Sequence, residues 1–252
     1  MPHSKDILHV SGYWSVPQNT KRSESHYEIF YKKTLDFIID GNLVFLSDSP
    51  EFAKKVKDAC RDRSINLNNK TIDIPSLPAR PLAASVLKST INMNLDVLLP
   101  PINGSREKAV IHYWRDLKGS GKDAYYAILT IWLSKIYILA QISRQLDKQF
   151  KFYAWMDISV SRFNGQRSQW DLSQLILDET KINHYPSNMQ MYGKELPLNA
   201  SYLAATPEAW ARLEKLYHKK ALRLSTMPYG HDEETILSEC IRTSPSLFNL
   251  IS

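Results

Sequence analysis

The chain has 252 residues, of which 43% are hydrophobic and 23% charged, with 8 glycines and 13 prolines. This composition excludes a disordered, collagen-like or low-complexity chain, and a chain of this length can bury a sizeable core without disulfide or metal staples. The 32 basic and 26 acidic side chains leave a formal charge of +6, a mild surplus that allows a nucleic-acid partner without indicating one.

The sequence carries no sign of export. Cys60 and Cys240 cannot form a disulfide framework and lack metal-type spacing. The N-terminal segment holds Lys5 and Asp6 and no long apolar run, unlike a signal peptide. Residues 125–143 are apolar but contain Lys135, and a central Lys costs about 2.5–3.5 kcal/mol in a membrane span. We therefore expect a core helix there and a soluble, cytoplasmic protein, with peripheral contact at the inner face of the membrane left open.

The first part of the chain alternates short apolar runs with helical stretches. We expect strands at residues 7–10, 43–46 and 71–74, and helices at residues 26–39 and 50–59. Asp48 or Ser49 is a candidate cap for the second helix, which begins at Pro50. Strands that alternate with helices predict an α/β fold with a mostly parallel central sheet flanked by helices.

The clearest unit lies between residues 123 and 163. Asp123 is a candidate N-cap for a helix of about 24 residues that ends near Lys148. Residues 152–156 form a continuous apolar run, typical of a strand buried on both faces, and the run stops at Asp157. In open α/β sheets, ligands bind outside the carboxyl ends of the strands. Asp157 therefore stands where a metal or a polar ligand is expected.

The remaining segments are less regular. Residues 82–122 give no clear element, and further helices are expected at residues 207–218 and 235–241. No internal repeat and no linker rich in Gly and Ser divides the chain, so the simplest expectation is one domain over residues 1–252.

Two residues near the expected strand exit could carry chemistry. Asp157 could hold a hard divalent cation that neutralises a diphosphate, or it could be a turn residue that accepts backbone N–H groups. Lys135 emerges from an apolar helical face, where it could present a compact charge to a phosphate. The alternative for Lys135 is a side chain that snorkels at the edge of a core helix.

Two short segments are weaker candidates. Residues 230–234 (GHDEE) precede an expected helix, and their carboxylates and His231 could supply a general base or a metal ligand. Acidic residues are also favoured in a first helical turn by the helix dipole. Residues 11–14 (SGYW) follow a strand and hold two aromatic side chains that could stack on a base or fill the core.

Other chemistries lack support in the sequence. It contains no P-loop, G-x-G-x-x-G, G-x-S-x-G, H-E-x-x-H or C-x-x-C motif. One dense basic group could contact phosphates or an anionic surface, but no nucleic-acid-binding motif accompanies it. Its members are Lys215, His218, Lys219, Lys220 and Arg223.

Taken in order, these segments resemble the HtrL/YibB-like bacterial family. The resemblance rests on Ser-Gly-Tyr-Trp after the first strand, on Ser134 and Lys135, on Tyr-Ala-Trp-Met-Asp-Ile-Ser at residues 153–159 followed by Arg162, and on the late Asp232 and Glu233. The family looks like glycosyltransferases of the GT-A type, which bind a nucleotide sugar on a Rossmann-like sheet. The resemblance implies a donor half at about residues 1–163 and an acceptor half at about 164–252.

The resemblance also implies a metal site and a donor site. Asp157 would take the first position of an Asp-x-Asp metal motif, Ser159 would take the second in place of an Asp, and a late ligand for Mn²⁺ or Mg²⁺ would come from His231 or Asp232. Lys135 would face the donor.

Three further sets of residues follow from the resemblance. Ser11, Gly12 and Tyr13 would meet the nucleotide, whereas Asn199, Ala200, Ser201 and Arg162 would bind the sugar and the acceptor. Asp232 or Glu233 would act as the base on the acceptor hydroxyl, although each could equally be a metal ligand or a cap.

The sequence thus predicts a glycosyltransferase that moves a sugar from a nucleoside-diphosphate donor to a hydroxyl, and the pathway we expect is surface glycan biosynthesis. One alternative is a catalytically inactive protein of the same fold that binds a nucleotide or a glycan, which the incomplete Asp-x-Ser motif would suit. A nucleic-acid-binding protein is the other alternative, and it would show an affinity that falls steeply with salt. We expect no nucleic-acid partner.

Overall fold

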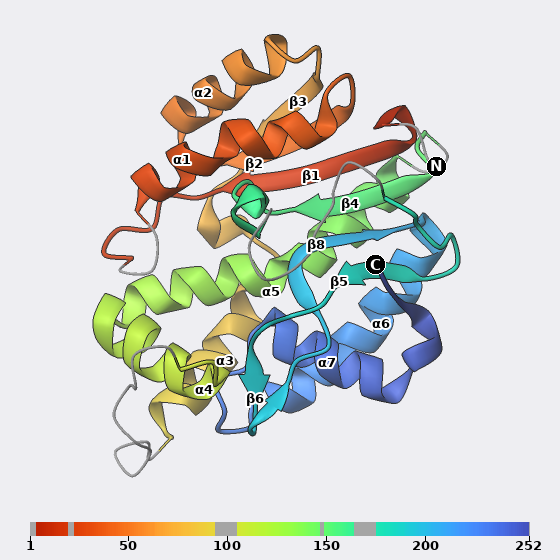
Figure 1. Ribbon diagram of the computed structural model, residues 1–252. Coiled ribbons are helices and arrows are strands. Elements are labelled where there is room, and N and C mark those ends of the chain that lie inside the picture. Colours follow the sequence, from red (N-terminus) through yellow and green to blue (C-terminus); the bar gives the residue numbers. More distant parts are fainter. Residues whose placement is uncertain (1–3, 20–22, 94–104, 147–148, 164–174, 252) are drawn as a thin grey trace.

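A seven-stranded sheet runs through the middle of the protein (Figure 1). The computed structural model describes residues 4–19, 23–93, 105–146, 149–163 and 175–251. The strands of the sheet, in spatial order, are β3 (Asn66–Thr71), β2 (Asn42–Ser47), β1 (Ile7–Tyr13), β4 (Phe152–Met156), β8 (Asn199–Ala205), β5 (Ile182–Tyr185) and β9 (Phe248–Leu250). β8 runs antiparallel to β4 and β5, and the other neighbouring pairs are parallel. The predicted α/β fold with a mostly parallel sheet is therefore confirmed.

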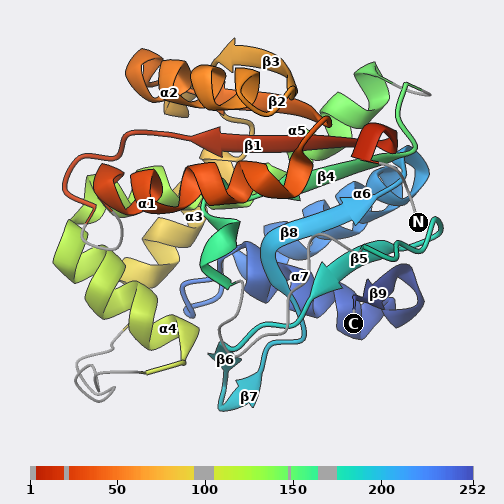
Figure 2. The ribbon, with the colours of Figure 1, turned by 45° about the horizontal axis from the view of Figure 1, so that its top comes forward.

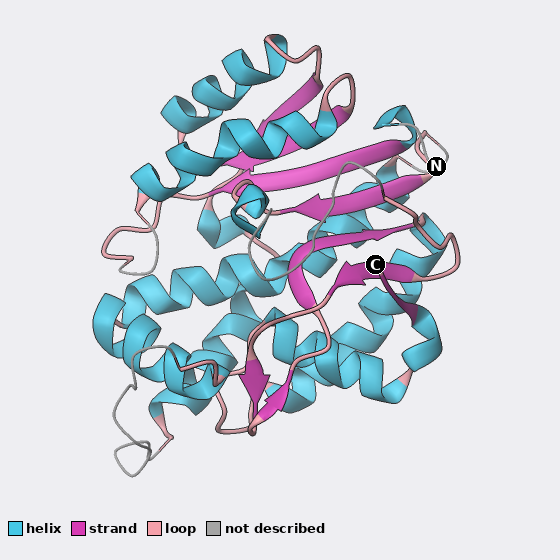
Figure 3. Ribbon diagram, in the orientation of Figure 1, coloured by secondary structure: helices cyan, strands magenta, loops and turns pink. Residues whose placement is uncertain are grey.

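Helices cover both faces of this sheet, which makes the arrangement Rossmann-like (Figures 2 and 3). One face carries α1 (Glu24–Leu35) and α2 (Pro50–Arg61). The other carries α3 (Arg80–Ile91), α5 (Lys122–Gln145), α6 (Pro207–Leu224) and α7 (Glu233–Thr243). The short helix α4 (Lys108–Ile111) continues as a π-helical stretch, η5 (His112–Gly119). β6 (Gln190–Met191) and β7 (Lys194–Glu195) form a separate small hairpin.

In the part of the chain that the structure describes, four short 3₁₀ helices lie close to strands, and a fifth extends α1. They are η1 (Ser4–Asp6) before β1, η3 (Ile74–Ser76) after β3, η6 (Val160–Phe163) after β4, η7 (Pro245–Leu247) before β9, and η2 (Asp36–Ile38) at the end of α1.

The central strands are apolar on both sides because each side meets a layer of helices. In β4, Tyr153 and Trp155 face the core under α5, whereas Phe152, Ala154 and Met156 face the core under α1 and α2. All five residues are buried, as expected for a strand with both faces covered. Alternation in β4 therefore divides one continuous apolar run between two cores.

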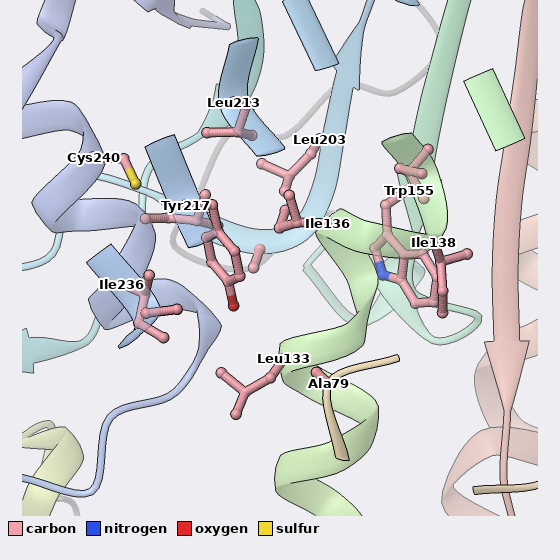
Figure 4. Packing of buried hydrophobic residues seen from close by; sticks show 14 of the residues in the cluster. Ala79, Leu133, Ile136, Ile138, Trp155, Leu203, Leu213, Tyr217, Ile236 and Cys240 are labelled. Atoms are coloured by element: carbon pink, nitrogen blue, oxygen red, sulfur yellow. The ribbon is translucent and has the colours of Figure 1, made fainter. Parts of the chain in front are cut away.

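The larger core lies between the sheet and helices α5, α6 and α7 (Figure 4). Tyr217 of α6 lies near Leu133 of α5 and Ile236 of α7, and Trp155 of β4 lies near Ile138 of α5. α5 is long and apolar enough to cross a membrane by length and composition, but 67% of its most apolar window is buried inside the fold. α5 is a helix of the core, as predicted.

Several predicted elements need correction. The third strand is Asn66–Thr71, not 71–74, because it is an edge strand whose polar side chains are exposed and show no apolar run. The helix predicted at 26–39 begins at Glu24 and turns into η2 at Asp36. Gly121, at φ 88°, holds the N-cap position of α5, and Asp123 lies in its first turn.

Other expectations hold. Ser49 caps α2, since its Oγ accepts from the Phe52 N–H at 3.2 Å. Asp48, the alternative cap, accepts from the Ser15 N–H at 2.9 Å and so ties the segment after β1 to the end of β2. The helix predicted at 207–218 is α6, which continues to Leu224. The predicted end near Lys148 and the boundary at residue 164 lie outside the described residues.

Candidate functional site

The carboxyl ends of β1 and β4 lie side by side (Figure 1). A cleft opens at these strand ends. From β1 the chain moves outward to β2 and then β3, and it later returns to place β4 on the other side of β1. Strand order therefore reverses between β1 and β4, and such a switch point is where open α/β sheets bind their ligands. The cleft holds about 620 Å³ of space between protein atoms, including the part open to solvent.

Aromatic rings form much of the lining of this cleft. They are Tyr13, Trp14, Tyr27, Trp132 and Trp155. Tyr13 stacks on Phe52 with ring centroids 4.0 Å apart, and Tyr27 meets the Tyr13 ring edge-on. The Trp14 indole N–H donates to the Ile72 carbonyl at 2.9 Å. These contacts fix flat apolar surfaces beside the strand ends, a surface on which a nucleotide base can stack.

Lys135 of α5 brings a positive charge to the cleft. Its Nζ lies 3.0 Å from Asp157 Oδ1 and 2.9 Å from Glu233 Oε1, and it donates to the Ala200 carbonyl at 3.3 Å. The same ammonium lies 5.5 Å from the centre of the Trp155 ring. Burial alone would lower the pKa of Lys135, but the two carboxylates outweigh it and raise that pKa above its ordinary value. Lys135 is therefore a fixed cation at neutral pH.

Asp157, directly after β4, is held by donors on both of its oxygens. Oδ1 accepts from the Trp155 indole N–H at 2.8 Å in addition to the Lys135 contact, and Oδ2 lies 3.4 Å from Arg162 Nη2. Arg162 also donates to the Ser159 hydroxyl at 2.6 Å and to the Ser201 hydroxyl at 2.9 Å. Arg162 thereby links the segment after β4 to the beginning of β8.

This donor arrangement does not fit the predicted metal site. The Asp157 oxygens and the Ser159 hydroxyl already accept from cationic or N–H donors, whereas a divalent cation requires oxygen lone pairs directed at it. His231 does not line the cleft; its Nδ1 lies 3.3 Å from Thr235 Oγ1. Within the described ranges, no group of three or more His, Cys, Asp or Glu side chains could hold a metal ion.

A second group of charges lies behind the cleft, where α7 begins. We call it the α7 latch: Lys108, His112, Asp116, Asp232 and Glu234. Lys108 Nζ lies 2.6 Å from Asp232 Oδ2 and 2.7 Å from Glu234 Oε2. His112 bridges two carboxylates, with Nδ1 2.8 Å from Asp116 and Nε2 3.0 Å from Asp232. The latch joins α4 and η5 to the N-terminus of α7.

Burial and pairing shift the pKa values in the latch in opposite directions. Burial alone would raise the pKa of Asp232, but the Lys108 ammonium and the His112 ring hold it well below its ordinary value. Burial alone would lower the pKa of His112, yet its hydrogen bonds to Asp116 and Asp232 raise it. Asp232 also caps α7, since its Oδ1 accepts from the Thr235 N–H at 3.0 Å. That position matches the cap alternative left open by the sequence.

Glu233 contacts the cleft residue Lys135, although Asp232, the residue before it, belongs to the α7 latch. Oε1 accepts from Lys135, and Oε2 is buried without a hydrogen-bond partner among the described residues. Burial raises the pKa of Glu233, and the Lys135 ammonium opposes that rise only in part. An unpaired buried carboxylate oxygen with a raised pKa is typical of a group that can accept a proton.

The structure brings most of the predicted residues to one edge of the sheet. Gly12, Tyr13, Lys135 and Asp157 line the cleft. Ser11 lies beneath it, fully buried, and its hydroxyl donates to the Met156 carbonyl at 2.6 Å.

The residues predicted to bind sugar and acceptor begin β8, beside the end of β4. Asn199 accepts from the Ser201 N–H at 2.8 Å, and the Ala200 N–H donates to Glu234 at 3.1 Å. The Asp157 N–H donates to the Ser201 carbonyl at 2.8 Å. β8 thus connects the cleft to the start of α7.

Sequence reasoning missed the latch residues Lys108, His112 and Asp116, and it missed Trp132. Residues 82–122 gave no clear element, so nothing placed these side chains on a common surface. The i, i+4 spacing of His112 and Asp116 was a usable signal, because residues four apart lie on the same side of a helix. Trp132 resembles any core residue of α5, and only the fold shows that it lines the cleft while its ring lies 5.3 Å from the His112 ring.

Comparisons with known proteins give little further information. No protein-family model matches the sequence, and no curated protein matches it. Among solved structures, the chain is similar to the apo form of mouse xyloside xylosyltransferase 1, with 11% sequence identity and a TM-score of 0.46, over 99% of this chain and 85% of that one. None of these comparisons assigns a function to this chain.

Proposed function

We propose that the protein is a glycosyltransferase of the GT-A type that moves a sugar from a nucleoside-diphosphate donor to a hydroxyl acceptor. The observation that carries the proposal is the cleft at the switch point, where aromatic rings surround Lys135 and Asp157. Nucleotides need a flat apolar surface for the base and a cation for the phosphates. All of the lining residues fall between Gly12 and Ile158, within the predicted donor half.

The contacts suggest a role for each part of the cleft. Gly12, Tyr13 and Trp14 offer the stacking surface for the base, and Lys135 offers its ammonium to the diphosphate. Asp157 offers carboxylate oxygens to hydroxyls of the donor, at the cost of weakening one of its present contacts. Arg162 contacts Asp157 and Ser201, and the beginning of β8, Asn199 to Ser201, lies beside the end of β4, where we place the sugar and the acceptor.

The transfer breaks the bond between the sugar C1 and the phosphate oxygen and forms a bond between C1 and the acceptor oxygen. Negative charge develops on the leaving diphosphate, and a preorganised cation stabilises it in the transition state. The proton of the acceptor hydroxyl needs a base, and Glu233 Oε2 supplies an oxygen with no other hydrogen-bond partner among the described residues. Asp232 is engaged by Lys108, by His112 and by the Thr235 N–H at the start of α7, so we assign the base role to Glu233.

Membership of the HtrL/YibB-like family, a role in surface glycan biosynthesis and a cytoplasmic location at the inner face of the membrane belong to the same proposal. They rest on the resemblance of the sequence segments around Ser11, Lys135 and Asp157. Peripheral membrane contact has the basic cluster of α6 as its support, since Lys215, Lys219 and Arg223 lie on one helix.

The proposal is tested with purified protein and a panel of uridine, guanosine and cytidine diphosphate sugars. We expect one class of donor to raise the melting temperature, because stabilisation grows as RT ln(1 + [L]/Kd), and to release nucleoside diphosphate over time. Asp157→Asn should slow that release by about two to three orders of magnitude, because the variant loses the charged acceptor that we place against the donor hydroxyls at the reacting centre. Asp123→Asn, an exposed carboxylate of α5, is the matched control and should leave the rate unchanged.

Two results would contradict the proposal in different ways. Binding of a donor without release of nucleoside diphosphate or transfer would favour the alternative of an inactive protein of this fold, which the Asp-x-Ser sequence at Asp157 and Ser159 suits. The absence of any thermal shift with every donor in the panel would remove the nucleotide-sugar assignment itself.

A further inference from the structure

The charges around Asp157 suggest how the cleft handles a diphosphate. Lys135 and Arg162 contact opposite oxygens of this one carboxylate, at 3.0 Å and 3.4 Å. Two fixed positive charges on one carboxylate leave a net charge of +1, the same as a divalent cation on one carboxylate. Two side chains of the protein therefore supply, at Asp157, the charge that a metal ion would otherwise bring.

Both cations are held in place by contacts that do not involve Asp157. The Lys135 ammonium also donates to the Ala200 carbonyl and to Glu233 Oε1. Arg162 is fixed by the hydroxyls of Ser159 and Ser201 and by the Ser159 carbonyl at 2.9 Å. Because these partners come from β8, from the segment between β4 and η6, and from the start of α7, the two cations stay in position when a ligand changes the charge near Asp157. Preorganised charges of this kind cost little reorganisation when a charged group arrives.

The residue at the second motif position is consistent with this arrangement. Ser159 is neutral and its hydroxyl accepts from Arg162 Nη1 at 2.6 Å. An Asp at that position would add a second negative charge next to Asp157, and a metal would then be needed to offset it. With Ser in its place, the Arg162 guanidinium contacts both Asp157 and the Ser159 hydroxyl, and this position adds no second carboxylate for an ion to offset.

Glu233 is the counter-argument, because it places a second carboxylate against Lys135. Its side chain is 7% exposed, and at 2.9 Å it offsets part of the charge of Lys135. That contact is with Lys135, whereas Arg162 contacts Asp157. Glu233 approaches from the N-terminus of α7 rather than from the cleft lining.

We infer that Lys135 and Arg162 are the counter-cations of the diphosphate in this cleft, and that nucleoside-diphosphate binding requires no divalent metal. The inference rests on the proposed function, since it takes the nucleoside diphosphate as the ligand. It departs from the metal site expected from the sequence resemblance at Asp157, Ser159 and His231.

Calorimetric titration with UDP, GDP and CDP tests the inference, in buffer with EDTA and in buffer with Mn²⁺ or Mg²⁺. We expect the nucleotide that binds to have the same Kd in all buffers within about threefold. A Kd that is tenfold or more lower with Mn²⁺ overturns this inference and leaves the proposed function in place. If none of the three nucleotides binds in any buffer, the proposed function fails and the inference fails with it.

A second measurement needs no nucleotide. The electron paramagnetic resonance signal of free Mn²⁺ disappears when the ion binds a protein, so titrating Mn²⁺ into the protein reports occupancy directly. We expect no Mn²⁺ site that depends on Asp157, so the unaltered protein and Asp157→Asn should give the same titration curve. Stoichiometric Mn²⁺ binding in the unaltered protein that disappears in Asp157→Asn overturns the inference.

The two cations are tested separately by substitution. Lys135→Gln and Arg162→Gln should each weaken nucleotide binding in EDTA by about tenfold or more, since a charge-assisted hydrogen bond is worth about 1.5–3 kcal/mol. Lys122→Gln removes an exposed lysine from the same helix and should bind like the unaltered protein. Unchanged affinity in both cleft variants overturns the inference.

One of these variants removes a buried charge and needs its own check. Lys135→Gln leaves Asp157 and Glu233 without their shared partner, so its folding is followed by circular dichroism. If Lys135→Gln does not fold, Arg162→Gln still tests the inference. Arg162→Gln should fold, because the side chain of Arg162 is 14% exposed and lies on a short 3₁₀ helix. Lys135→Arg keeps the charge, and it should retain binding in EDTA to a greater extent than Lys135→Gln.

Discussion

Two groups of charges meet at the N-terminus of α7, and they differ in what borders them. In the cleft group, Lys135 and Asp157 line the open space at the ends of β1 and β4, and Arg162 and Glu233 pair with them from outside the lining. None of the α7 latch residues lines the cleft. The side chains of His112, Asp116 and Asp232 are each at most 1% exposed, and those of Lys108 and Glu234 are each 10% exposed. Both groups pair a lysine with carboxylates, so residue type alone does not separate a binding site from a structural contact.

The difference shows how one short sequence can serve two purposes. Asp232 and Glu233 are neighbours in the chain, yet Asp232 caps α7 and pairs with Lys108, whereas Glu233 turns to Lys135 beside the cleft. A helix N-terminus separates the directions of successive side chains by about 100°, because the helix has 3.6 residues per turn. The same acidic run can therefore hold the helix in place and supply a group to the site.

The largest expected effect is on the latch. Asp232→Asn removes the carboxylate that Lys108 and His112 share, and breaking a buried ion pair on one side typically costs about 3–5 kcal/mol. We expect urea unfolding, followed by circular dichroism, to show a loss of this size. Nucleotide affinity of the folded protein should stay close to that of the unaltered chain.

Asp36→Asn is the matched control for this substitution. Asp36 pairs with Arg63 at 2.7 Å, but its side chain is 52% exposed, and exposed pairs contribute about 0–1 kcal/mol. If Asp232→Asn instead kept its stability and lost nucleotide binding or transfer, Asp232 would belong with the cleft and the distinction between the two groups would fail.

A smaller effect on the free energy of unfolding is expected from a substitution at Gly12, which lines the cleft. A Cβ on Gly12 would lie 2.4 Å from Cζ3 of the Trp14 ring and 3.1 Å from the Leu46 carbonyl oxygen. The Trp14 indole is anchored to the Ile72 carbonyl, so the ring cannot move freely. Gly12→Ala should therefore cost about 1–3 kcal/mol of overpacking, and it should weaken nucleotide binding, measured by calorimetric titration.

Ser11→Ala gives the comparison one residue earlier. The Ser11 hydroxyl donates to the Met156 carbonyl away from the cleft lining, so its loss should lower the free energy of unfolding by about 1 kcal/mol and leave nucleotide affinity unchanged. A larger loss of affinity in Ser11→Ala than in Gly12→Ala would place Ser11 at the nucleotide, as the sequence resemblance implies.

The strands that build the cleft could be predicted because they are buried on both faces. The apolar runs of β1, β2 and β4 predict these strands, and Asp157 can be identified as the polar residue that directly follows the run of β4. β3 could not be found this way, since an edge strand made of NLNNKT is stabilised by backbone pairing with β2 and not by an apolar pattern.

The ion pairs between residues far apart in the chain also could not be predicted from the sequence. Lys108 and Asp232 are 124 positions apart, and Lys135 and Glu233 are 98 positions apart. No local periodicity links such residues, and only the packing of the N-terminus of α7 against the start of α4 and the middle of α5 brings them together. The saturation of Asp157 by Lys135 and Arg162 is likewise a property of the fold, and it is the reason a metal motif read from the sequence does not match the geometry.

The smallest expected effect concerns pH and again falls on the latch. His112 faces Asp116 on its own helix, Asp232 at the start of α7, the nearby Lys108, and the rings of Tyr125 and Trp132 on α5. The folded state raises the pKa of His112 above its unfolded value of about 6.5. A raised pKa contributes stability below the unfolded value, and this contribution is lost as the pH rises through the folded value.

The difference in unfolding free energy between the unaltered chain and His112→Gln should therefore be largest in mild acid and shrink as the pH rises. Urea unfolding between about pH 5.5 and 8.5 measures it, a range that spans the ordinary titration of His. In an Asp232→Asn background the trend should weaken, because one of the two carboxylates that hold the proton on His112 is then neutral. A difference that grew with pH would mean that His112 is neutral in the folded protein, and the latch would then be held by Lys108 alone rather than by two cations.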